Sequence, residues 1–166
     1  EREGTDVKLL IVDDSKAMRA IVRRALNKFE HKTFSIRKAP SGKEALTIIG
    51  AWQPDIVLSD WHMPGMSGLE LISIIKRKKL PIKVGLVTTE KNTDRLKQAI
   101  EVGAEFVLAK PFNDSELHDV IFPLINKNSV PVNEFVLPEL MRIQQTFKRS
   151  LNVEVKLTGI PKQQVT

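Results

Sequence analysis

Short apolar runs alternate with amphipathic segments along the first three quarters of the chain. The runs at 7–12, 55–59, 82–87 and 105–109 are five or six residues long and mostly apolar. Such runs are typical of parallel strands that are buried on both faces. Residues 33–38 alternate between apolar and polar side chains, which predicts a fifth strand.

The segments between these runs carry apolar residues three and four positions apart, as amphipathic helices do. They predict helices at 15–29, 43–49, 69–78, 92–102 and 114–125. We expect Ser15 to cap the first helix, Gly50 to end the second and Gly103 to end the fourth. In the first helix, Met18, Ile21, Val22, Ala25, Leu26 and Phe29 are expected to face inward.

Strand and helix alternate five times with short connections. This pattern indicates parallel strands joined by right-handed crossovers, with helices on both faces of the sheet. We therefore predict an α/β fold with a doubly wound, five-stranded parallel sheet of flavodoxin-like order 2-1-3-4-5. The domain is expected to span residues 6–126.

Residues 127–166 have a different pattern. A polar, proline-containing stretch is followed by one apolar helical face and by an alternating segment at 153–157. One helix and one strand cannot form a core by themselves. We interpret 127–166 as a linker with a helix-plus-strand C-terminal extension or as the start of a truncated second domain. Pairing of 134–158 between two copies would give a homodimer.

Composition excludes several classes of protein. The chain of 166 residues has no cysteine, so a disulfide scaffold, a zinc ribbon and a thiol nucleophile are excluded. No apolar run approaches the length of a membrane span, and we expect a cytoplasmic protein without membrane contact. The net charge of +6 is shared evenly by 1–126 and 127–166. The one dense basic run, 76–79, falls at a predicted helix end, where the helix dipole favours it, so nucleic-acid binding is not expected.

Polar side chains follow the strands at the edge where ligands bind in open α/β sheets. They are Asp13 and Asp14 after the first strand, Asp60 after the third, Thr88 after the fourth and Lys110 after the fifth. Three carboxylates in one pocket repel one another by roughly 4 kcal/mol per pair at ~4 Å and an effective dielectric constant of ~20. Mg²⁺ would relieve this repulsion, because it prefers oxygen ligands. Each residue alone could be a helix cap, a turn or a surface residue, but together they suggest a phosphoryl-binding site with a carboxylate nucleophile.

Four segments carry a family resemblance: 9–15 (LLIVDDS), 59–71 (SDWHMPGMSGLEL), 87–90 (VTTE) and 103–112 (GAEFVLAKPF). They resemble the receiver domain of two-component response regulators, most closely the chemotaxis receivers of the CheY type, over about residues 6–126. The resemblance implies a signalling switch with self-phosphorylation and autodephosphorylation, and no other enzyme activity. A histidine kinase would donate the phosphoryl group, and a protein output partner would bind the face from the fourth to the fifth helix. Residues 127–166 would then be a tail or the start of an output domain.

The resemblance also implies a role for each polar residue. Asp60 resembles the phosphoacceptor, Thr88 the hydroxyl that moves toward the phosphoryl group, and Lys110 the lysine that pairs with it. Mg²⁺ would be bound by Asp14 directly, by Asp13 through water, by Asp60, and by the backbone carbonyl of His62. The Lys110–Pro111 peptide bond is expected to be cis.

Three positions depart from the family pattern. Val107 stands where the family usually has an aromatic switch residue, and strand alternation would turn Phe106 to the other face. Thr89 and His62 stand beside the pocket, where Thr89 would tighten its mouth. A phosphohydrolase of the haloacid dehalogenase type would need Asp-x-Asp after the first strand, and a flavin module would need a phosphate loop there. An assembly module that is not phosphorylated is the other alternative, and Val107 favours it.

Overall fold

The computed structural model describes residues 6–30 and 32–126. Within them, β1 (Val7–Val12), β2 (Phe34–Ala39), β3 (Ile56–Asp60), β4 (Lys83–Thr88) and β5 (Phe106–Ala109) form one sheet. All neighbouring strands are parallel, and their order is β2-β1-β3-β4-β5. The flavodoxin-like fold predicted from the sequence is thus confirmed.

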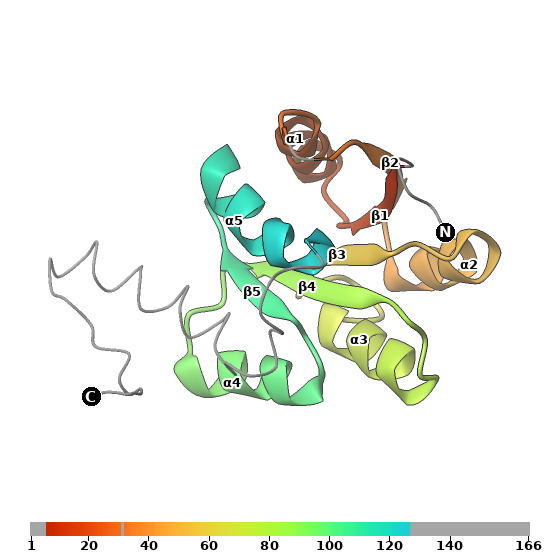
Figure 1. Cartoon of the computed structure of the whole chain (residues 1–166). Coiled ribbons are helices and arrows are strands. Elements are labelled where there is room, and N and C mark those ends of the chain that lie inside the picture. Colours follow the sequence, from red (N-terminus) through yellow and green to blue (C-terminus); the bar gives the residue numbers. More distant parts are fainter. Residues whose placement is uncertain (1–5, 31, 127–166) are drawn as a thin grey trace, which may run out of the picture.

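Helices cover both faces of the sheet (Figure 1). The helices α1 (Lys16–Asn27) and α5 (Asp114–Ile125) lie on one face, and α2 (Gly42–Trp52), α3 (Gly68–Arg77) and α4 (Thr93–Val102) lie on the other. The last four residues of β1 are all apolar because the strand is covered by helices on both sides. Leu9 and Ile11 join the core under α1 and α5, whereas Leu10 and Val12 join the core under the other three helices.

Two of the predicted helix caps are confirmed. The Ser15 hydroxyl accepts a hydrogen bond from the Met18 N–H at the start of α1, and Gly103 ends α4 with a φ of +133°. The prediction for α2 is wrong. This helix continues through Gly50 to Trp52 and ends at Gln53, which adopts a left-handed φ of 55°. The extra turn lets Trp52 pack against the core under α2, beneath the guanidinium of Arg37.

The inward face of α1 is narrower than its sequence pattern predicts. Val22, Ala25 and Leu26 are buried, but Ile21 is 41% exposed. Successive residues of a helix are turned by about 100°, so Ile21 lies beside the buried stripe.

The predicted C-terminal extension at 127–166, including the dimer segment 134–158, lies outside the described residues. Among the helices of the described part, none is long and apolar enough to cross a membrane.

Candidate functional site

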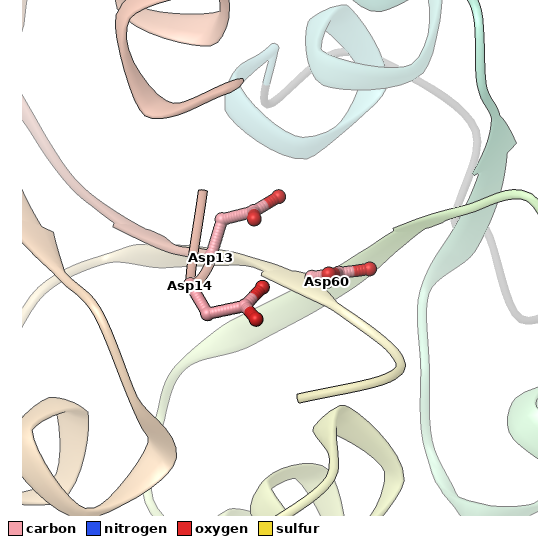
Figure 2. Close-up of side chains that lie close together, drawn as sticks. All are labelled: Asp13, Asp14 and Asp60. Carbon is pink, nitrogen blue, oxygen red and sulfur yellow. The ribbon is translucent and has the colours of Figure 1, made fainter. Parts of the chain in front are cut away.

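Three carboxylates meet at the carboxyl ends of two adjacent strands. Asp13 and Asp14 directly follow β1, and Asp60 is the last residue of β3. Figure 2 shows the three side chains extending to the same side of these strand ends. Each offers an oxygen, and these oxygens lie within 4.8 Å of one another. The site therefore lies where strand order reverses, the usual place for ligands in this kind of sheet.

Lys110 bridges two of these carboxylates. Its Nζ lies 3.3 Å from Asp13 Oδ2 and 3.4 Å from Asp60 Oδ1, and its side chain is only 15% exposed. The other oxygen of Asp13 accepts a hydrogen bond from the Ser15 N–H at 2.8 Å. Asp14 is exposed, and no hydrogen bond or ion pair from a described residue reaches its carboxylate. Asp13 and Lys110 are thus fixed by the protein, whereas Asp14 faces solvent.

The negative charge of the Asp60 carboxylate is only partly balanced by its neighbours. Burial raises the pKa of its carboxyl, and the neighbouring Asp13 adds to this effect. The Lys110 ammonium and the backbone N–H of Trp61 act in the opposite direction, but the pKa stays above its ordinary value of 3.8. One lysine does not balance this group of carboxylates, so the site favours a further cation.

Thr88 is brought to the same edge by the ends of β4 and β5. The Lys110 N–H donates to the Thr88 carbonyl at 2.8 Å, which ties the two strand ends together. The Thr88 side chain is fully buried, and its Oγ1 accepts a hydrogen bond from the Glu90 N–H at 3.0 Å. The Lys110–Pro111 peptide bond is cis, as the resemblance implies.

The loop after Asp60 is held by a close backbone approach. Gly68 donates its N–H to the Trp61 carbonyl at 2.8 Å, and a Cβ at Gly68 would lie 2.2 Å from the Asp60 carbonyl oxygen. Only glycine lets the first residue of α3 lie this close to the end of β3. The sequence 61–67 is therefore folded back over the strand end.

His62 lies in this loop with its ring stacked on Trp61, at 5.6 Å between centroids and 12° between planes. The Trp61 side chain is buried, whereas that of His62 is 54% exposed. His62 Nε2 points to Glu90 Oε1 at 3.5 Å. A metal-binding role for the His62 carbonyl stays a prediction.

The reasoning from sequence assigned no site role to Glu90, although it lies inside the VTTE motif. A threonine hydroxyl that accepts from the N–H two residues later is a common local turn, so the Thr88–Glu90 contact could have been anticipated. The contacts of the Glu90 side chain with His62 and Arg95 depend on tertiary structure, and no spacing in the sequence indicates them.

Val107 and Phe106 lie on opposite faces of β5, as strand alternation predicts. Val107 belongs to the core under α2, α3 and α4, and Phe106 to the core under α1 and α5. Phe106 therefore does not take the place of the aromatic residue that is absent at position 107.

Residues 9–122 match the family model of the response regulator receiver domain. The chain belongs to this family. Receiver domains of two-component systems work with histidine kinases and output domains. The match covers every described strand and helix in full except the first two residues of β1 and the last three residues of α5.

Two curated relatives illustrate the range of this family. Sporulation initiation phosphotransferase F of Bacillus subtilis is 35% identical over 114 residues, which are 69% of this chain and 90% of that protein. The phosphate regulon transcriptional regulatory protein PhoB of Pseudomonas aeruginosa is 34% identical over 111 residues. These cover 66% of this chain but 47% of PhoB, so the receiver spans about half of that relative.

Solved structures show the same fold. The receiver domain of the putative response regulator NarL from Mycobacterium tuberculosis superposes with a TM-score of 0.66 at 29% identity, over 70% of this chain and 94% of that one. The chemotaxis protein CheY4 of Vibrio cholerae gives a TM-score of 0.66 at 28% identity, over 73% of this chain and 100% of that one.

Proposed function

We propose that this receiver accepts a phosphoryl group on Asp60 from the phosphohistidine of a histidine kinase, in a reaction that requires Mg²⁺. The phosphoryl group then alters a protein-binding surface formed by α4, β5 and α5, as in a chemotaxis-type switch. One observation carries the proposal. The Lys110 ammonium contacts both Asp13 and Asp60 beside a third carboxylate, at the point where strand order reverses.

The donor set fits magnesium. The three side chains that converge offer only carboxylate oxygens, the ligand type that Mg²⁺ prefers while it retains several waters. We assign Asp14 as the direct ligand because it is exposed and, among the described residues, its carboxylate accepts no hydrogen bond and forms no ion pair. Asp13 would act through water, and Asp60 and the His62 carbonyl would complete the protein ligands. A bound Mg²⁺ would offset the charge of the carboxylates and of the phosphoryl oxygens.

The chain's own residues account for the transfer. A carboxylate oxygen of Asp60 attacks phosphorus, the P–O bond forms while the P–N bond to the kinase histidine breaks, and the imidazole keeps the electron pair of that bond. Lys110 already lies 3.4 Å from Asp60 Oδ1, so its charge is in place when the phosphoryl oxygens arrive. Thr88 offers a hydroxyl proton from the neighbouring strand end. The product is an acyl phosphate, which water later hydrolyses.

A non-phosphorylated assembly module is the second candidate, and Val107 is the observation that favours it. A receiver without the usual aromatic at this position lacks one element of the family's switch. The complete set of three carboxylates, Thr88 and Lys110 counts against this alternative, because an assembly role places no demand on them.

Intact-mass measurement tests the proposal. Acetyl phosphate with Mg²⁺ should add the mass of one phosphoryl group to the full chain, and chelation of the metal should prevent the addition. Asp60→Asn should abolish labelling, whereas Asp94→Asn, which changes an exposed carboxylate in α4, should not. Equal labelling of the Asp60→Asn variant at another residue would overturn the assignment.

A further inference from the structure

Four side chains form a cluster between the end of β3 and the start of α4: Trp61, His62, Glu90 and Arg95. The guanidinium of Arg95 lies over the Trp61 ring, 5.4 Å from its centroid. Its Nε lies 3.3 Å from Glu90 Oε1, the same oxygen that His62 faces at 3.5 Å. Arg95 thus connects the ring of Trp61, which follows Asp60, to the carboxylate of Glu90, whose backbone N–H donates to Thr88.

Glu90 connects this cluster to the first turn of α4. Its second oxygen, Oε2, accepts the Asn92 N–H at 3.1 Å, and the Asn92 side chain caps α4 by accepting the Arg95 N–H at 3.1 Å. The Asn92 N–H and the Arg95 charge lower the pKa of the Glu90 carboxyl. The carboxylate therefore remains ionised at neutral pH, and the first turn of α4 is attached to the loop that follows Thr88.

We propose that Arg95 is a positioning residue that restrains the first turn of α4 in the unphosphorylated arrangement, and that loading of Asp60 weakens this restraint. The inference rests on the proposed function. Thr88 Oγ1 accepts the Glu90 N–H in the present arrangement. An anionic group on Asp60 attracts the Thr88 hydroxyl proton, and rotation of that hydroxyl toward Asp60 takes Oγ1 away from the Glu90 N–H. Glu90 then loses one of the contacts that keep it beside Arg95.

The packing of β5 favours a role for Arg95 in coupling Asp60 to α4. Val107 is a buried aliphatic side chain, and Phe106 is held in the core on the other face of the sheet. No aromatic side chain on the α4-facing side of β5 can therefore change its rotamer when Asp60 is phosphorylated. Trp61 directly follows Asp60 in the sequence, and Arg95, whose guanidinium lies over the Trp61 ring, belongs to the first turn of α4.

Thermodynamic reciprocity fixes the sign of the effect. If the Arg95 restraint favours the unloaded state, removal of the restraint must favour the loaded state and tighten binding of an anion at Asp60. Loss of a positive charge near the site has the opposite effect, because it weakens attraction for an anion. The two explanations therefore predict changes of opposite direction.

The experiment titrates the full chain with beryllofluoride in saturating Mg²⁺, since this anion occupies the position of a phosphoryl group on a carboxylate. Arg95→Gln should lower the Kd about threefold to tenfold. The matched control is Lys97→Gln, which removes an exposed charge from the same helix and should leave the Kd unchanged or slightly raised. Arg95→Lys keeps the charge beside Glu90 but loses the flat guanidinium over Trp61, and it should fall between the wild type and Arg95→Gln.

Hydrogen exchange gives a second readout. The amides of Asn92 and Arg95 should exchange faster when the wild type is loaded, and they should already exchange fast in unloaded Arg95→Gln. An unchanged or raised Kd in Arg95→Gln relative to Lys97→Gln would overturn the restraint. Thermal unfolding of each unloaded variant verifies that α4 is not simply lost. If the wild type binds no beryllofluoride at all, the proposed function fails instead, so the two failures are distinct.

Discussion

The ring of Phe106 lies over Gly85, its partner in the pairing of β4 with β5. A Cβ at Gly85 would come within 2.1 Å of Phe106 Cζ. Gly85 does not need a left-handed conformation, so glycine is required here for space and not for backbone freedom. The missing side chain on β4 makes room for an aromatic ring in the core under α1 and α5.

Gly85→Ala should therefore destabilise the receiver by roughly 2–3 kcal/mol, because the methyl group overpacks a core position between two paired strands. Urea unfolding of the full chain measures the difference. Gly50→Ala is the control, since a Cβ at this exposed position in α2 meets nothing within 4 Å. It should stabilise by about 0.5–1 kcal/mol. Equal effects of the two substitutions would show that the Phe106 ring does not fill this space.

The strand order and the proximity of Asp13, Asp60 and Lys110 could be predicted from the sequence. They follow from the spacing of apolar residues and from the alternation of strands and helices. Parallel strands bring their carboxyl ends to one edge, whatever the side chains pack against. The end of α2 could not be predicted in this way. Glycine commonly ends a helix, but α2 continues past Gly50 because Trp52 packs against the core. The Arg95 contacts with Trp61 and Glu90 were also beyond sequence reasoning, since three separate segments must fold before they exist.

Asp60→Asn should stabilise the metal-free receiver at neutral pH, because it removes a negative charge that burial and the neighbouring Asp13 disfavour. The folded-state pKa of Asp60 is raised above 3.8, so the folded protein binds this proton more tightly than the unfolded chain does. Ionisation of Asp60 therefore lowers the free energy of unfolding, and this loss occurs as the pH rises through the folded-state pKa. The advantage of the variant should appear as pH rises above about 4 and be absent below it.

Chemical unfolding across pH, with Asp119→Asn as an exposed-carboxylate control, measures this effect. Millimolar Mg²⁺ should stabilise the wild type more than Asp60→Asn, since ligand binding to the folded state adds stability. A variant that is less stable than the wild type at neutral pH without metal would contradict the argument.

Lys110→Met should retain Mg²⁺ binding and tighten it about threefold to tenfold, because the ammonium that now contacts Asp13 and Asp60 competes with the cation. Phosphorylation by acetyl phosphate should nevertheless slow by at least about tenfold, since the positive charge is missing when the phosphoryl oxygens arrive. Calorimetric titration and the labelling rate separate the two effects.

Asp14→Asn gives the opposite pattern in the same two measurements. Metal affinity should fall strongly because a direct carboxylate ligand is lost. Labelling should then recover in part at high Mg²⁺ concentration. Weakened metal binding in Lys110→Met together with normal binding in Asp14→Asn would mean that the two roles are assigned the wrong way round.

Truncation after Asn126 should leave a folded receiver that is phosphorylated on Asp60, because both described cores are built from residues between β1 and α5. We propose that 127–166 is a separate extension and that apolar residues in 134–158 pair two copies. Burial of each of those side chains would stabilise the dimer by roughly 1.5–3 kcal/mol. Light scattering should then give a dimer for the full chain and a monomer for the truncated form. Equal association of both lengths would rule out this pairing, and loss of the truncated fold would show that the domain extends beyond Asn126.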